Sequence, residues 1–321
     1  MQIENTNQPY LHVSDLLSEK AEPLQLQLVA GKEGLSNPIY GPKIQKPGLA
    51  LTGFTEYVRP GRVQILGESE IAFLHQLDQE RREEVLRQLC SIEIACFIIT
   101  RNISPPPEII QEAEKHHIPL MVTPLVTSIC IERMHSFLSD MLAPKTYLHA
   151  DLLDIFGLGV LFIGDSGIGK SECALDLIVR GHRLVSDDIV VIKKTTDTIL
   201  IGTSPDLIRY HMELRGLGVI NIKDLFGISA LSLSKKIELV ISLERWKPDV
   251  AYDRLGLEEN LYEILGVNLP LIRMPVAPGR NIAILVEVAS RNYLLKSQGY
   301  NASRDLAQKI DDIASDRPLK K

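Results

Sequence analysis

Residues 164–171 read Gly164-Asp165-Ser166-Gly167-Ile168-Gly169-Lys170-Ser171, and they indicate the fold of the region around them. These eight residues match G-x-x-x-x-G-K-[ST], the pattern of a loop that holds nucleotide phosphates between a buried strand and a helix. Residues 159–163 (GVLFI) have the length and composition of a buried strand, and apolar residues recur at helical spacing in 171–180 (SECALDLIVR). The sequence therefore predicts a strand, a phosphate loop and a helix in succession.

Each part of this motif has a physical role in holding phosphate. The backbone N–H groups of the loop and the positive end of the helix dipole attract phosphate oxygens. Lys170 supplies a mobile cation, and the Ser171 hydroxyl is a ligand for Mg²⁺. A glycine-rich turn without a ligand is the alternative interpretation, and the flanking strand and helix patterns count against it.

Length and composition are those of a soluble protein with two domains. The chain has 321 residues, of which 45% are hydrophobic and 24% charged, and no apolar run is long enough to cross a membrane. The first residues have no signal-peptide pattern, and the four cysteines lack C-x-x-C spacing, so a cytoplasmic protein with reduced thiols is expected. A net charge of −6 argues against nonspecific binding to nucleic acid.

Residues 1–140 are expected to form an α/β domain, because short apolar runs alternate with helical patterns. Strands are expected at residues 23–31, 62–67, 94–100 and 118–123. Helices are expected to begin at residues 13–17 and to cover residues 68–90, 105–117 and 127–143. A boundary is placed near residue 140.

Residues 141–321 are expected to form the domain that contains the phosphate loop. Two strand-like runs within residues 146–164 precede the loop. Further strands are expected at residues 182–194, 197–203, 216–222, 236–244 and 281–289, and residues 289–313 are expected to be mainly helical.

Asp187 and Asp188 follow the strand-like run 183–186 and form a pair of carboxylates close to the loop in sequence. Carboxylates at the end of a strand beside a phosphate loop can hold Mg²⁺ or accept a proton from an attacking hydroxyl. Solvated aspartates of a turn are the alternative. The short separation from Lys170 also predicts an unusual strand order in the sheet.

Other polar residues are candidates for the phosphate site only because of their position in the sequence. His149 lies just ahead of the strand that leads to the loop, although a lone histidine is more often a packing or surface residue. Glu213 can complete a metal shell. Arg215 and Arg280 lie beside a glycine and Arg254 lies two residues before one, in loops where a guanidinium can contact phosphate.

Taken together, these stretches resemble the bacterial HPr kinase/phosphorylase family over nearly the whole chain. The resemblance rests on residues 164–172, 181–188, 212–227, 252–256 and 275–292 of the second domain. In the first domain it rests on residues 46–54, 61–67, 97–102 and 118–123, while residues 1–9 are this chain's own extension.

The resemblance implies an N-terminal α/β domain and a C-terminal P-loop kinase domain related to the phosphoenolpyruvate carboxykinase core. It implies a bifunctional enzyme that uses ATP and Mg²⁺ to phosphorylate a serine of the phosphocarrier protein HPr. In the reverse reaction, inorganic phosphate attacks the phosphoserine and pyrophosphate is released. A cytoplasmic homohexamer in the regulation of carbohydrate metabolism is also implied, with no role for nucleic acid or membranes.

Roles follow from the resemblance at the matching positions. The catalytic residues implied are His149, Lys170, Asp187, Asp188 and Arg254. Ser171 and Glu213 are implied as Mg²⁺ ligands, and residues 212–221 as a stretch needed for both activities. Residues implied to act in dephosphorylation are Pro275, Val276, Ala277, Pro278, Gly279 and Arg280. The choice between Asp187 and Asp188 as the base stays open.

Two other functions are consistent with a phosphate loop. One is a small-molecule kinase of the phosphoenolpyruvate carboxykinase type, which requires a pocket for a carboxylate. The other is a nucleotide sensor without catalytic activity, which needs fewer charged groups around its loop. The residues of the first domain indicate a fold class but no reaction.

Overall fold

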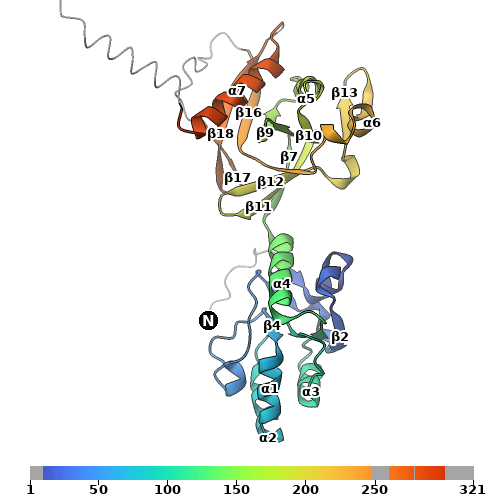
Figure 1. The fold of residues 1–321 in the computed structure, drawn as a ribbon, viewed down its shortest axis with the longest axis vertical. Coiled ribbons are helices and arrows are strands. Elements are labelled where there is room, and N and C mark those ends of the chain that lie inside the picture. The colour runs from blue at the N-terminus through green and yellow to red at the C-terminus, as the bar shows by residue number, and fades with distance from the viewer. Residues whose placement is uncertain (1–9, 247–259, 278, 301–321) are drawn as a thin grey trace, which may run out of the picture. The chain divides into compact units, whose positions relative to one another are not determined.

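The chain forms two compact units, Met1–Ala143 and Pro144–Lys321. The structure is a computed structural model, and it describes residues 10–246 and 260–300 apart from residue 278. Figure 1 labels the main helices and strands of both units, and each unit is described by itself.

The first unit is built on a four-stranded sheet with the order β2-β6-β5-β4. Its strands are β2 (Gln27–Ala30), β4 (Val63–Leu66), β5 (Cys96–Ile99) and β6 (Leu120–Val122). Strands β4, β5 and β6 are parallel, as the alternation of strands and helices predicts, and β2 is antiparallel at the edge. A separate antiparallel pair is formed by β1 (Tyr10–His12) and β3 (Pro38–Tyr40).

Helices cover both faces of this sheet. The helices of the first unit are α1 (Glu68–Gln76), α2 (Gln79–Cys90), α3 (Pro107–Lys115) and α4 (Thr127–Leu142). Leu74, Leu86 and Ile109 of the first three pack with Phe97 in one core cluster. Residues of α4 pack with Ile98 and its neighbours on the opposite face. The alternation of side chains along β5 thus divides the core in two.

Short 3₁₀ helices connect the remaining elements of this unit. They are Val13–Leu17, Glu19–Leu24, Lys32–Ser36 and Ala50–Thr52. The helix expected to begin at residues 13–17 is therefore a single 3₁₀ segment and does not continue as an α-helix.

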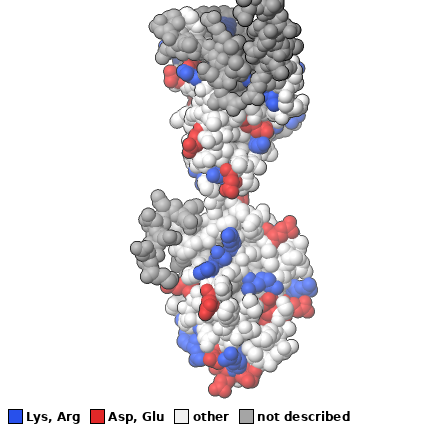
Figure 2. All heavy atoms as spheres, turned by 90° about the vertical axis from the view of Figure 1, so that its left-hand side faces the viewer, with Lys and Arg blue, Asp and Glu red and all other residues white. Residues whose placement is uncertain are grey.

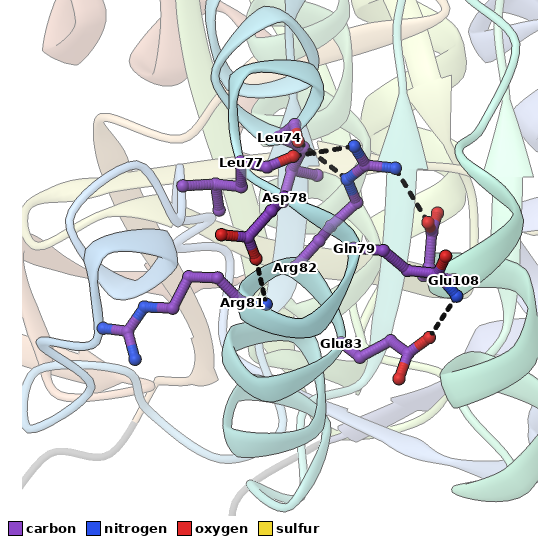
Figure 3. Close-up of polar contacts among 8 residues, drawn as sticks. All are labelled: Leu74, Leu77, Asp78, Gln79, Arg81, Arg82, Glu83 and Glu108. Atoms are coloured by element: carbon purple, nitrogen blue, oxygen red, sulfur yellow. Dashed lines mark hydrogen bonds and ion pairs between the residues drawn. The ribbon is translucent and has the colours of Figure 1, made fainter.

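The single helix expected over residues 68–90 is wrong, because it is two helices that break at Leu77 and Asp78 (Figure 3). Asp78 caps α2, since its side chain accepts a hydrogen bond of 2.8 Å from the backbone N–H of Arg81. The guanidinium of Arg82 donates to the carbonyls of Leu74 and Leu77, at 2.8 and 2.9 Å. Capping of both new ends offsets the loss of helical hydrogen bonds at the break.

The second unit contains a mixed six-stranded sheet with the order β10-β8-β9-β16-β18-β17. Its strands are β8 (Asp151–Ile155), β9 (Leu158–Gly164), β10 (Arg183–Ser186), β16 (Leu239–Arg245), β17 (Asn260–Ile264) and β18 (Val267–Val276). Strands β9, β16 and β18 are parallel, and the other pairs are antiparallel. The loop strand β9 thus lies between an antiparallel and a parallel neighbour, which is the unusual order that the short spacing predicts.

A four-stranded antiparallel sheet with the order β15-β12-β11-β7 packs on one face of the larger sheet. Its strands are β7 (Lys145–His149), β11 (Ile189–Thr196), β12 (Ile199–Thr203) and β15 (Ser234–Lys236). Leu152 and Leu161 of the larger sheet share a core cluster with Val190 and Ile192 of the smaller one.

Helices α5 (Lys170–Val179) and α7 (Ile282–Ser297) pack on the other face of the larger sheet (Figure 1). The strand expected over residues 281–289 is wrong, because α7 begins there. Asn281 caps this helix through a 3.0 Å hydrogen bond from Ile284 N–H, and Ala283 and Val286 are its buried residues in the core cluster. A continuous apolar run does not by itself distinguish a buried strand from a helix.

A hairpin and short helices complete the described part of this unit. They are β13 (His211–Leu214), β14 (Gly218–Asn221), α6 (Ile222–Phe226) and the 3₁₀ segments Asp206–Ile208 and Ile228–Ala230. The helix expected to continue to residue 313 ends at Ser297, because residues 298–300 are not helical, and residues 301–313 lie outside the described part.

Two of the places where the chain crosses between the four-stranded and six-stranded sheets of this unit correct two predictions. Residues 146–164 form three strands, because the chain leaves the smaller sheet after His149 and enters the larger at Asp151. Residues 182–194 form two strands, because β10 ends at Ser186 in the larger sheet and β11 starts at Ile189 in the smaller. The strand end expected before Asp187 is confirmed.

The surface charges, the lengths of the helices and the state of the cysteines agree with the composition of the chain. Acidic and basic side chains are interspersed among uncharged ones on the face that Figure 2 shows, in keeping with 35 basic and 41 acidic residues in the chain. Among the described residues, every helix is too short or too polar to cross a bilayer. The four cysteines are buried and free, as expected.

Candidate phosphoryl-transfer site

The phosphate loop joins β9 to α5 as its sequence predicts. Gly164 has φ of 148°, and a Cβ atom there would lie 2.5 Å from the carbonyl oxygen of Leu243. Ile168 is buried in the core cluster beneath α5, so the middle of the loop is anchored. The residues just before it, Asp165, Ser166 and Gly167, are exposed. The loop therefore presents its backbone to solvent while its apolar residue holds it in place.

Lys170 is the first residue of α5, and its side chain turns back over the loop. Its Nζ donates to the carbonyl oxygens of Gly164 and Asp165, at 3.0 and 3.3 Å. The ammonium group and the free N–H groups of the first helical turn lie at the same end of α5. This arrangement concentrates positive potential where a phosphate group can bind.

Asp187 is a buried carboxylate at the helix end of the loop. It is 4% exposed, and its Oδ2 accepts a 3.1 Å hydrogen bond from Glu213 N–H. Burial raises the pKa of Asp187, and the Glu213 N–H and the Ser171 hydroxyl act in the opposite direction. The interpretation of Asp187 as a solvated turn aspartate is therefore wrong.

Asp188 has the opposite environment from its neighbour. Its side chain is 68% exposed, and its Oδ1 lies 3.8 Å from Nδ1 of His149, whose side chain is 84% exposed. The strand register explains this proximity, because His149 pairs with Ile189 across β7 and β11. The two side chains thus face solvent together where the chain leaves the smaller sheet after β7 and where it enters the same sheet at β11.

Asp151 belongs to this site but was not selected from the sequence. It is fully buried, and its Oδ1 accepts a 3.0 Å hydrogen bond from the N–H of Asp188. Burial raises its pKa to about 8, and the nearby charge of Asp187 acts in the same direction. A charged residue directly before the apolar pair Leu152 and Leu153 was the available signal, because a buried charged residue needs a partner.

The hairpin β13–β14 brings Glu213 and Arg215 to the loop. Met212 and Leu214 are buried in the core cluster, so the alternation of the strand turns Glu213 outward. The guanidinium of Arg215 lies against Gly167, where an added Cβ would meet Nη1 at 2.7 Å. Two candidates that lie more than forty residues beyond the loop in sequence are thus beside it in space.

Strand register also brings Pro275 and Val276, at the end of β18, to this edge of the sheet. Leu243 of β16 pairs with Gly164 on one side and with Met274 on the other. Because these strands are parallel, their carboxyl ends meet at one edge. Arg280 donates to the carbonyl oxygen of Pro275 at 3.2 Å. Pro278 lies outside the described residues, as does Arg254.

The donors near the loop fit a hard cation. Oδ1 of Asp187 is buried and has no hydrogen-bond partner of ordinary geometry among the described residues, although the Ser171 hydroxyl lies near enough to lower the pKa of the carboxyl. Within the described part of the chain, no three histidine, cysteine or acidic residues cluster as a metal site. Mg²⁺ bound with nucleotides needs only one or two protein oxygens, since water and phosphate supply the others.

Comparisons with known proteins agree on one family. The model of the HPr serine kinase C-terminal domain matches residues 140–310, and that of the HPr serine kinase N terminus matches residues 11–138. An HPr kinase/phosphorylase of Geobacter sulfurreducens is 48% identical over 96% of this chain and 97% of its own length. That of Bacillus licheniformis is 40% identical over 97% and 99%.

Solved structures include the Hpr(Ser) kinase/phosphatase of Coxiella burnetii, which is 38% identical. It aligns with 50% of this chain and 98% of its own, with a TM-score of 0.46.

The loop between β9 and α5, with carboxylates gathered beside it, defines the second unit as a P-loop phosphate-binding domain. The comparisons then make the assignment specific. The chain belongs to the HPr kinase/phosphorylase family, whose members are protein-serine kinase and phosphorylase enzymes. The expected resemblance and the expected two-part α/β architecture are confirmed.

Proposed function

We propose that this chain transfers the γ-phosphoryl group of ATP to a serine of HPr and catalyses the reverse transfer to inorganic phosphate. The observation that supports this most directly is the position of Asp188 and His149, exposed together beside the phosphate loop. A site for a protein substrate must offer its reactive groups to the solvent. Buried groups alone cannot reach a serine on another protein.

The residues of the loop, Gly164–Ser171, are proposed to hold the phosphates of ATP. Their backbone N–H groups and the N-terminus of α5 stabilise negative charge. The Nζ of Lys170 now contacts two loop carbonyls and can exchange them for phosphate oxygens by rotation of its side chain. Arg254 is proposed to neutralise charge that develops on the transferred group, as the family resemblance implies.

The environments of the two aspartates suggest separate roles. Asp188 is the better base, because its exposed carboxylate can reach the hydroxyl of a docked serine. Asp187 is better suited to the metal, because its buried Oδ1 lacks a strong donor. Ser171 and Glu213 are proposed to complete the protein share of the metal shell. Bound Mg²⁺ would supply charge neutralisation between the β- and γ-phosphates.

In the reverse reaction, an oxygen of inorganic phosphate attacks the phosphorus of phosphoserine. The bond from phosphorus to the serine oxygen breaks, the serine oxygen takes a proton, and pyrophosphate leaves. Asp188, protonated in the forward direction, is the proposed donor. His149 is proposed to orient the attacking phosphate and to accept its proton, and the segment 275–280 is proposed to act in this direction at the same sheet edge.

The wider role follows from the family resemblance and is also proposed. HPr is the protein partner, the assembly is a cytoplasmic homohexamer, and the reaction regulates carbohydrate metabolism. The 1–140 domain is proposed to serve regulation or assembly and the 141–321 domain to contain the catalytic site. Mass measurement in solution tests the assembly.

Labelled ATP and purified HPr test the function. We expect Mg²⁺-dependent label on one serine of HPr, and its removal by phosphate with formation of labelled pyrophosphate. ATP binding without transfer to HPr would indicate a nucleotide sensor. Transfer to a small carboxylate substrate but not to HPr would indicate a kinase of the phosphoenolpyruvate carboxykinase type. Either result refutes the proposal.

A further inference from the structure

Both the backbone carbonyl and the backbone N–H of Asp188 are hydrogen-bonded. The N–H of Ala150 donates to the carbonyl oxygen of Asp188 at 3.0 Å, and the N–H of Asp188 donates to Oδ1 of Asp151 at 3.0 Å. The residues of the first crossing between the sheets, Ala150 and Asp151, are therefore hydrogen-bonded to Asp188 in the second crossing. One of these two contacts depends on a side chain and can be altered by substitution.

The backbone of Asp188 has a conformation that needs support. Its φ is 63°, in the left-handed region that residues with a Cβ atom seldom adopt. Its N–H points away from solvent to the fully buried carboxyl group of Asp151. Without an acceptor there, this N–H would lose its hydrogen bond or the turn would change conformation.

Stability alone does not explain a carboxyl group at this position. Asp151 is the first residue of β8 and is followed by the buried Leu152 and Leu153. Its Oδ2 has no hydrogen-bond partner among the described residues. Burial of a polar atom without a partner is unfavourable, and an apolar side chain of similar size would avoid that cost. The benefit must lie in what Oδ1 holds.

We propose that Asp151 is a positioning residue for phosphoryl transfer. It fixes the left-handed turn at Asp188 and so aims the exposed Asp188 carboxylate at the substrate, beside His149. The inference rests on the proposed function, since it assumes that Asp188 acts in the transfer. A displacement of about 1 Å in a reacting group can lower a rate by about 100-fold. A hydrogen bond that fixes the position of the Asp188 carboxylate can therefore have a large effect on the rate of transfer.

Two substitutions separate the acceptor from the rest of the side chain. Asp151→Asn keeps Oδ1 as an acceptor for the N–H of Asp188, whereas Asp151→Leu has similar volume and no acceptor. For transfer from ATP to HPr, we expect Asp151→Leu to lower kcat by at least about tenfold with KM for ATP changed less than about twofold. Asp151→Asn is expected to retain kcat within about threefold.

A matched control removes effects of stability. Leu153→Ala also alters a fully buried residue of β8, away from the Asp188 turn, and is expected to lower stability but leave kcat of the folded enzyme unchanged. Wild-type kcat in Asp151→Leu would refute the inference. Equal loss in Asp151→Asn and Asp151→Leu would refute it too, because the acceptor would then be irrelevant.

Hydrogen exchange in the wild-type protein tests the contact without any variant. The amide of Asp188 is expected to exchange at least about 100-fold more slowly than an unprotected amide, although the side chain is 68% exposed. Fast exchange of this amide would overturn the inference even if Asp151→Leu fails to fold. Absence of HPr labelling by wild-type protein would instead overturn the proposed function, so the two failures are distinguishable.

Discussion

Oδ1 of Asp188 lies 3.8 Å from Nδ1 of His149, at a point where the chain twice leaves one sheet for another. His149 ends β7 and Asp188 immediately precedes β11, and these strands pair in the smaller sheet. The proximity therefore depends on strand register rather than on closeness in sequence. Both side chains face solvent, which is where a protein substrate must bind.

Lys170 is expected to be essential for transfer and almost neutral for stability. Its ammonium contacts only two loop carbonyls among the described residues, so little folding energy depends on it. Lys170→Met should lower labelling of HPr by at least about 100-fold, because it removes the ammonium group that stabilises negative charge on the phosphates during transfer. Lys32→Met, which changes an exposed lysine of the first unit, is the control and should leave labelling unchanged.

Asp188→Asn is expected to bind ATP normally and to lower transfer by about 100-fold or more, the usual range for a lost general base. Asp187→Asn should instead raise the Mg²⁺ concentration needed for half-maximal rate, because a buried metal ligand is weakened. Titration of Mg²⁺ in the labelling assay distinguishes the variants. The assignment of the two aspartates is wrong if their effects are exchanged.

His149→Gln is expected to affect the reverse reaction more than the forward one. An amide can still donate a hydrogen bond but cannot accept a proton from phosphate near neutral pH. Phosphate-dependent loss of label should slow by about tenfold, with ATP-dependent labelling within about threefold of the wild-type rate. Parallel losses in both directions would show that His149 serves a step common to both.

Asp151 should make the second unit less stable as the pH rises. Its pKa is raised to about 8 in the folded state, so between about pH 4 and pH 8 the native protein retains a proton that the unfolded chain releases. The free energy of unfolding should fall over this window by at most about 1.4 kcal/mol per pH unit. Stability from this group is complete at the acid end and lost at the alkaline end.

Urea unfolding at pH 5, 6.5 and 8 with a chelator measures this effect. Trp246, the single tryptophan of the chain, lies in the second unit and its fluorescence can report on that unit. Asp151→Asn should flatten the pH dependence. An unchanged slope in this variant would contradict the raised pKa of Asp151.

Arg82 should stabilise the first unit through the break between α1 and α2. Arg82→Ala frees the carbonyls of Leu74 and Leu77 and leaves Glu108, which Arg82 contacts at 2.7 Å, without its partner. The loss should be about 2–4 kcal/mol. Calorimetry should show a lower Tm, while Gln79→Ala, at an exposed position beside the break, should change Tm little.

Much of the fold was predictable because it depends on local patterns. The phosphate loop, its strand and its helix follow from spacing and composition, as do the parallel strands of the first unit. Local patterns failed at residues 68–90, where the Asp78 cap outweighs helix continuity, and at residues 281–289, where apolar residues suit strand and helix alike. Asp78 was a visible cap signal within a long helical pattern.

The phosphate loop at Gly164–Ser171 and the polar residues that are candidates for roles beside it could be recognised from the amino-acid sequence alone. Only the tertiary structure distinguished a buried Asp187 from an exposed Asp188 and placed the missed Asp151 beneath them. The physical reason is that burial and hydrogen bonding depend on strand register between distant segments. Residues 149–151 and 186–189 meet only because both cross from one sheet to the other at the same place.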